Sequence, residues 1–184
     1  VSRANLHNIS IMKELGIEHY NSKVLVYKAN MIIPQISQVI ASDTHEVIRI
    51  PEKCPLCGGD TEIRKEVDSE MLYCANSQCE GKLVNRIEHF FGKKGLDAKG
   101  ISKATISKLI DFGWVTRIAD VFDLSRYASE WKNLPGFGEK SVSNILGSIE
   151  ACRNCDLESA IAGIGIPLVG RTVARDLAKR FANY

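Results

Sequence analysis

Four cysteines lie between a segment that reads mainly as strands and a segment that reads mainly as helices. They form two short pairs, Cys54 with Cys57 and Cys74 with Cys79, and 16 residues separate the pairs. Each pair can place two thiolates on one tight turn, and two such turns close a tetrahedral cage around a single Zn²⁺. We therefore predict a structural zinc site with these four ligands. Six cysteines in a secreted chain would suggest disulfides, but the metal spacing favours a reduced, cytoplasmic protein.

Composition restricts the classes of function. The 184 residues are 45% hydrophobic and 25% charged, as in a soluble globular protein of one ordinary domain or a few small modules. The net charge is only +2, so affinity for nucleic acid must come from local patches. No apolar run is long enough to span a membrane. The chain begins at Val1 without a basic-then-apolar leader, and we expect an excised fragment without a secretion signal.

Residues 1–50 read mainly as strands. β-rich runs occupy residues 24–27, 32–33 and 47–50, and Pro34 suggests an edge strand or a bend. Two or three strands cannot close a barrel, so we expect the C-terminal part of a β-domain. Residues 7–16 are predicted to form a short helix or loop that ends at Gly16.

Residues 51–82 form the predicted zinc module. A small hairpin is expected between the cysteine pairs, with strands at residues 61–67 and 71–73. No apolar cluster in this segment is large enough to fold unaided. Metal binding, which contributes about 10–16 kcal/mol in small zinc modules, would supply the stability.

From residue 83 the pattern becomes helical and repetitive. A first helix is predicted over residues 83–91. Three later segments, 102–110, 138–146 and 170–178, share one pattern in which a small residue precedes a helix with apolar positions four, seven and eight residues on. Their offsets of 36 and 32 residues are typical of helix–turn–helix repeats.

The middle repeat carries the clearest functional signal. Its turn contains Gly136, Phe137 and Gly138, followed by Lys140 in the first helical turn. The glycines permit close backbone approach and positive φ, and the phenylalanine would anchor the turn in the core. The backbone N–H groups at the helix N-terminus could then hold a phosphate, with the lysine reaching the same anion. We predict contacts to the DNA backbone that do not read bases.

The other two repeats are weaker candidates for a phosphate site. The first keeps Gly100 but has Ser102 in place of the second glycine, followed by Lys103. The third keeps only Gly170, followed by Arg171. Glycine turns between helices are also common in proteins that bind no nucleic acid. Three tandem copies beside a zinc module favour DNA binding.

No catalytic residue is predicted. Cys152 and Cys155 have C-x-x-C spacing, which would allow a redox role, but they stand alone. Neither His7 nor His89 lies in a recognisable nucleophile arrangement, and the chain has no phosphate-binding P-loop motif. The visible chain therefore reads as non-catalytic.

The order of these motifs resembles bacterial NAD⁺-dependent DNA ligase over essentially the whole chain. Residues 1–8 are similar to the family segment V-S-R-A-T-L-H-N, with Asn5 in place of threonine, and residues 29–35 are similar to A-G-D-V-I-P-Q, with Met31 in place of an acidic residue. The four cysteines match the finger of the family, and residues 134–141 match its hairpin. Glu80 and Gly81 replace a usual Pro-Ala pair.

The resemblance implies a multi-domain fold: the C-terminal part of an OB-fold at 1–50, a four-cysteine zinc finger at 51–82, and an all-α helix-hairpin-helix domain at 83–184 that lacks one repeat. The finger would be a structural joint. Arg3 and His7 would contact the minor groove near a nick, and the hairpins would grip the flanking phosphates. The nucleotidyl-transfer domain with its lysine nucleophile has no counterpart here, and neither does the BRCT domain.

The parent enzyme would seal nicks in duplex DNA during replication and repair, using NAD⁺ and Mg²⁺. This segment would bind Zn²⁺ but neither NAD⁺ nor Mg²⁺, would not ligate, and would be a cytoplasmic monomer whose partner is duplex DNA, preferably nicked, with no membrane association. Two alternatives remain. A helix-hairpin-helix subunit of another repair protein would need a catalytic carboxylate cluster, which we do not find. A zinc-stabilised protein-interaction module is disfavoured by the hairpin and the OB-like start.

Overall fold

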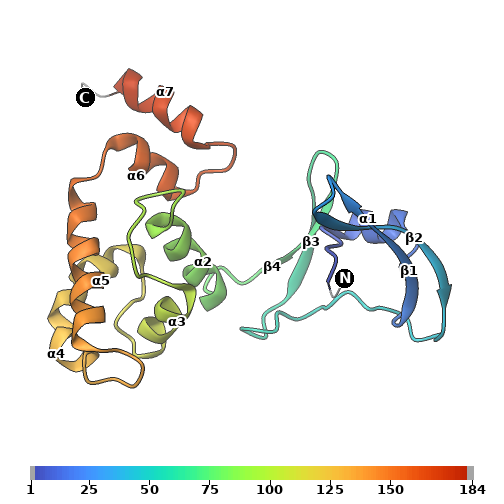
Figure 1. The fold of residues 1–184 in the computed structure, drawn as a ribbon, viewed down its shortest axis with the longest axis horizontal. Coiled ribbons are helices and arrows are strands. Elements are labelled where there is room, and N and C mark those ends of the chain that lie inside the picture. The colour runs from blue at the N-terminus through green and yellow to red at the C-terminus, as the bar shows by residue number, and fades with distance from the viewer. Residues whose placement is uncertain (1–2, 182–184) are drawn as a thin grey trace. The chain divides into compact units, whose positions relative to one another are not determined.

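A computed structural model describes residues 3–181, and the chain divides into two compact units, Val1–Ser77 and Gln78–Tyr184 (Figure 1). Residues 1–2 and 182–184, the outer ends of the predicted domains 1–50 and 83–184, lie outside the described residues.

Within residues 3–77, the first unit contains a short helix and two antiparallel strand pairs. Helix α1 (Ile9–Glu14) begins at Asn8, whose side chain accepts a hydrogen bond from the backbone N–H of Ile11 at 2.9 Å. Strand β1 (Ser22–Ala29) pairs antiparallel with β2 (Ile33–Ser42), with register shifts after Lys23 and Leu25. The second pair is β3 (Thr61–Lys65) with β4 (Glu70–Cys74).

Most of the elements predicted for this unit are confirmed. The helix lies within residues 7–16, β1 contains the run 24–27, and β3 and β4 form the expected hairpin. Pro34 lies in β2, opposite Lys28, in a sheet of two strands where every strand is an edge.

The strand predicted at residues 47–50 is wrong. Only Val47 forms an isolated bridge, with His19, and the N–H of Ile48 donates to the carbonyl of Glu18 at 2.8 Å. The segment runs beside residues 18–20 and is followed by Pro51, which has no N–H to continue a ladder.

The second unit is helical, and its elements follow one another closely. They are α2 (Glu80–Phe91), α3 (Lys103–Asp111), the 3₁₀ segment η1 (Ile118–Tyr127), α4 (Ala128–Trp131), α5 (Glu139–Ala151), the 3₁₀ turn η2 (Cys152–Asn154), α6 (Leu157–Ile164) and α7 (Arg171–Phe181). The predicted helix at 83–91 and the helix of each repeat are confirmed, as α2, α3, α5 and α7. Helix α2 contacts α3, η1 and α6.

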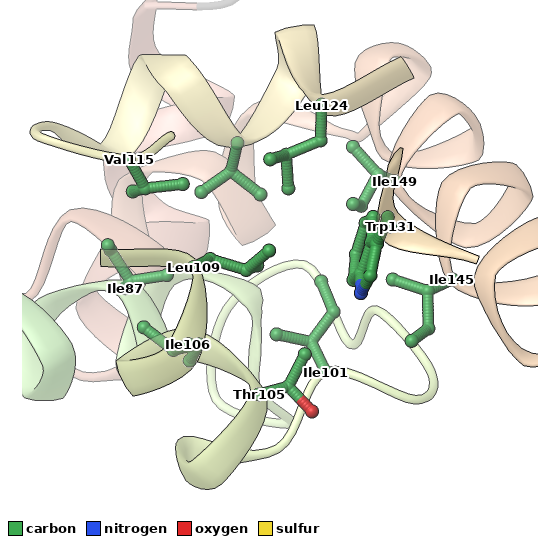
Figure 2. Close-up of a pocket in the computed structure, with 11 residues that line it drawn as sticks. Ile87, Ile101, Thr105, Ile106, Leu109, Val115, Leu124, Trp131, Ile145 and Ile149 are labelled. Carbon is green, nitrogen blue, oxygen red and sulfur yellow. The ribbon is translucent and has the colours of Figure 1, made fainter. Parts of the chain in front are cut away.

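The apolar faces of α2, α3 and α5 meet η1 and α4 in one core (Figure 2). Trp131 is completely buried among these side chains, next to a cavity of about 10 Å³. Its indole Nε1 has no hydrogen-bond partner among residues 3–181. The full core set is Val84, Ile87, Phe91, Ile106, Leu109, Val115, Val121, Leu124, Trp131, Val142, Ile145 and Ile149.

Across residues 3–181, none of the helices has both the length and the apolar character needed to cross a membrane.

Candidate metal centre and nucleic-acid interface

The four predicted zinc ligands come together. The Sγ atoms of Cys54, Cys57, Cys74 and Cys79 all lie within 4.8 Å of one another, and two of the four residues are buried. The Sγ atoms of Cys57 and Cys74 are 3.5 Å apart. Four thiolates at about 2.3 Å from one Zn²⁺ would be about 3.8 Å apart in a tetrahedron. The donor set and its spacing therefore fit a four-coordinate metal such as zinc.

Local backbone geometry shapes the turn around the first cysteine pair. The N–H of Gly58 donates to the carbonyl of Cys54 at 2.9 Å, and the N–H of Cys54 donates to the carbonyl of Gly59 at 2.8 Å. Gly58 has φ +66°, a left-handed conformation that favours glycine. A Cβ on Gly59 would lie 2.9 Å from the Cβ of Asn76. Both glycines are therefore required by the turn.

The same turn polarises one thiol. Backbone N–H groups of Cys57 and then Leu56 point at the sulfur of Cys54 and lower the pKa of its thiol. Hydrogen bonds that stabilise a thiolate favour the form that binds metal. At the other end of the cluster, the carbonyl of Cys79 accepts the N–H groups of Lys82 and Leu83, and this residue is the N-cap of α2.

The hairpin of the middle repeat is anchored as predicted. Gly136 has φ +86°, and the N–H of Phe137 donates to the carbonyl of Leu134 at 3.1 Å. The half-buried ring of Phe137 contacts the buried ring of Trp131, with centroids 5.6 Å apart and planes at 69°. The turn is thereby held against the core of the second unit.

Gly138 differs from the prediction in its backbone conformation. Its φ is −105°, so the expectation of a positive φ at this position is wrong. It is the N-cap of α5, and its carbonyl accepts the N–H of Val142 at 3.0 Å. Among residues 3–181, no side chain caps the helix, and a Cβ at this position would meet no atom within 4 Å. The glycine thus leaves open space at the N-terminus of the helix, where backbone N–H groups have no intrahelical acceptor.

The first repeat differs at the same position. Ser102 is the N-cap of α3, and its Oγ accepts the N–H of Thr105 at 3.1 Å. The serine hydroxyl therefore already accepts one of the N–H groups at the N-terminus of this helix. Gly100 has φ +80°, and a Cβ there would lie 2.9 Å from Cγ1 of Ile145, so this glycine serves packing. Lys103 faces Glu88 at 3.9 Å.

The third repeat resembles the second. The carbonyl of Gly170 accepts the N–H of Ala174 at 2.9 Å, and a Cβ at Gly170 would meet no atom of the described residues within 4 Å. The guanidinium of Arg171 donates from Nη2 to the carbonyls of Lys93 and Gly95, at 3.3 and 3.5 Å. The arginine that was predicted to contact phosphate is thus hydrogen-bonded to the loop that follows α2.

The two predicted minor-groove residues lie at the start of the first unit. Arg3 and His7 are both exposed, and His7 has φ +60° with its N–H bonded to Oδ1 of Asn5 at 2.8 Å. His7 lines an open hollow of about 370 Å³ together with Met12 and Met71.

Cys152 and Cys155 do not form a reactive pair. Cys152 is buried, its Sγ lies 3.7 Å from the carbonyl of Leu96, and burial raises the pKa of its thiol. A thiol in this setting is a poor nucleophile.

Many basic side chains are paired with carboxylates, whereas Lys140 and Lys108 have no carboxylate oxygen within 4.0 Å in the described part of the chain. The paired groups of the second unit include Lys99, Arg117, Arg126, Lys132, Arg153 and Arg175. Lys140 was predicted from its place in the first turn of α5. Lys108 was not, because its position over the ring of Phe137, 5.1 Å from the centroid, depends on how α3 packs.

Several DNA ligases are similar to this chain in sequence. The chain is 43% identical over 183 residues to a DNA ligase of Lachnoclostridium phytofermentans and 41% identical over 183 residues to one of Ruminiclostridium cellulolyticum. Each match covers 98% of this chain and 27% of the relative. A DNA ligase of Pseudothermotoga lettingae is 37% identical over 189 residues, covering all of this chain and 27% of the relative. No protein-family model matches the chain.

Proposed function

Since the chain is homologous to DNA ligases and spans about a quarter of their length, we propose that it is the DNA-clamping portion of an NAD⁺-dependent DNA ligase that seals nicks in duplex DNA. Its role would be to hold the duplex through the sugar–phosphate backbone. Sequence readout is not needed for this task, because a nick can occur in any sequence.

One observation carries the proposal: the helix N-terminus at Gly138 is open while its hairpin is fixed. Phe137 packs on the core tryptophan, so the turn is preorganised, and Gly138 places no side chain before the first N–H groups of α5. Backbone amides and the positive end of the helix dipole favour an anion at such a position. Lys140, exposed in the first turn, adds a cation.

The third repeat would provide a second, similar contact at Gly170. The first repeat would contribute less through its amides, because the Oγ of Ser102 already accepts one of them. Arg3 and His7 at the start of the chain remain proposed contacts to the minor groove. In this proposal the chain comprises the OB-fold portion (1–50), the zinc finger (51–82) and the helix-hairpin-helix domain (83–184).

The four cysteines would hold one structural Zn²⁺. All four coordination positions would be filled by thiolates, so the ion would supply no open site for a substrate and would act by stabilising residues 51–82. We expect neither nucleotidyl transfer nor NAD⁺ binding from these residues.

The proposal is tested by measuring the affinity of the zinc-loaded chain for a fluorescent nicked duplex by anisotropy. The wild type should bind, with competition by unlabelled duplex of unrelated sequence. Sequence-dependent competition would contradict a backbone clamp. Incubation with NAD⁺ followed by mass spectrometry should show no adenylylated protein.

A further inference from the structure

Lys108 extends from the first repeat onto the hairpin of the second. It lies in the last turn of α3, and its Nζ is 5.1 Å from the centroid of the Phe137 ring. The same Nζ is 3.6 Å from the position that a Cβ on Gly136 would take. The ammonium group therefore lies directly beside the glycine turn that precedes α5.

This ammonium group is exposed and has no carboxylate oxygen within 4.0 Å among residues 3–181. An aromatic face attracts a cation but accepts no conventional hydrogen bond, so the three N–H donors of the ammonium stay available. The nearest acidic group of the hairpin helix, Glu139, is instead 3.7 Å from Lys132. Lys108 thus adds a positive charge beside the glycine turn that precedes α5.

Glycine at position 136 keeps the space beside this charge clear. A side chain there would contact the ammonium group, because even a Cβ would lie 3.6 Å from Nζ. The first repeat thus closes its own helix N-terminus with Ser102 and places a lysine at the neighbouring hairpin.

We propose that Lys108 is a DNA-phosphate contact of the second hairpin, supplied by the first repeat. This inference rests on the proposed function of the hairpin. The first repeat would then take a direct part in binding. It would supply a positive charge beside the hairpin of the second repeat, although the N-terminus of its own helix is capped by Ser102. Its partner is the phosphodiester backbone of duplex DNA.

The test is the salt dependence of nicked-duplex binding by the zinc-loaded chain with Lys108→Gln, Lys108→Arg and, as a matched control, Lys179→Gln. Lys179 is an exposed lysine in the last turn of another helix, α7. Each phosphate contact contributes about 0.9 to the slope of log K against log salt, so Lys108→Gln should lower the slope by about one. Lys108→Arg should keep the slope of the wild type, because the charge is retained, and Lys179→Gln should change the slope much less than Lys108→Gln.

Two results would overturn the inference. One is an unchanged slope for Lys108→Gln; if this variant also binds more weakly and has a lower unfolding midpoint, Lys108 only supports the hairpin. The other is an equal fall in slope for Lys179→Gln, which would indicate a general field effect. Each of these leaves wild-type binding, and with it the proposed function, intact. A folded wild type that binds no duplex would overturn both.

Discussion

The ring of Phe137 meets the buried ring of Trp131 edge-on, with centroids 5.6 Å apart. The first ring belongs to the hairpin that we propose as the phosphate site, and the second lies in the centre of the helical core. The packing of the core therefore supports the conformation of the hairpin. Substitutions in the core and in the hairpin should show which residues determine stability and which determine DNA affinity.

Replacement of Trp131 should lower the free energy of unfolding in proportion to the side-chain volume removed. Trp131→Ala should lower the free energy of unfolding by about 3–5 kcal/mol, because it opens a cavity in a packed core. Trp131→Phe should lower the free energy of unfolding by less than about 1.5 kcal/mol. It keeps an aromatic ring in the core, and the indole N–H that it removes has no hydrogen-bond partner among residues 3–181. Denaturant unfolding followed by circular dichroism measures both. Equal losses for the two variants would contradict this account of the core.

The two hairpin glycines should respond differently to alanine. Gly136→Ala should destabilise the chain by about 1–2 kcal/mol, because an L-residue at φ +86° is strained. Gly138→Ala should cost only a few tenths of a kcal/mol, since φ −105° suits any residue and alanine is merely a poorer N-cap. Denaturant unfolding, followed by tryptophan fluorescence, distinguishes them. A larger loss for Gly138→Ala would refute the backbone assignment.

Stability and DNA affinity should move in opposite directions in Gly138→Asp. Aspartate is a good N-cap, so the helix should gain a few tenths of a kcal/mol. Its carboxylate would occupy the open N-terminus and repel a phosphate, so affinity for nicked duplex should fall. Gly138→Asn, a cap of the same size without charge, is the control and should lose less affinity. An Asp variant with wild-type affinity would exclude this helix N-terminus as a phosphate site.

Loss of one cysteine ligand should unfold the zinc module without touching a catalytic group. We expect Cys57→Ser to reduce bound zinc from about one ion per chain to near zero, since a closed site needs all four thiolates. Trypsin should then cleave quickly at Lys53, Arg64 and Lys65, which flank or lie in β3. Cys155→Ser, an exposed cysteine outside the cluster, should keep both the metal and the resistance to trypsin. Full zinc content in Cys57→Ser would contradict the four-ligand site.

Acid should destabilise the helical unit partly through Asp120. The guanidinium of Arg117, together with the N–H and hydroxyl of Thr116, holds the pKa of Asp120 well below its usual range. A carboxyl whose pKa is lowered by folding stabilises the folded state above its unfolded pKa, about 3.9, and loses that contribution as the pH falls below it.

Asp120→Asn should therefore flatten the fall in the urea midpoint between about pH 5 and pH 2. The control Asp111→Asn, an exposed carboxylate at the end of α3, should follow the wild-type curve. A wild-type pH profile in Asp120→Asn would show that this carboxylate contributes nothing to acid stability.

Sequence patterns predicted the regular elements that carry a strong local signal. The four cysteines, the β3–β4 hairpin and the helix of each repeat were all predictable, because their spacing and periodicity are set within a few residues. The prediction of a strand at residues 47–50 was wrong because a short β-rich run forms a strand only when another strand can pair with it along its length.

Other features depend on contacts between distant residues. Neither η1 nor α6 was predicted, and the ring of Trp114 stacks on that of Tyr127 at 4.6 Å only once η1 has formed. The N-cap role of Gly138 could not be distinguished from a positive-φ role, because glycine suits both. The position of Lys108 over Phe137 depends on the packing of α3, and nothing near Lys108 in the sequence indicates it.

The salt dependence of binding to a nicked duplex tests the clamp most directly. If the zinc-loaded chain holds two to four phosphates, log K should fall with log salt at a slope of about −2 to −4. Undetectable binding, or binding that does not change with salt, by a chain shown to be folded and zinc-loaded would contradict the account.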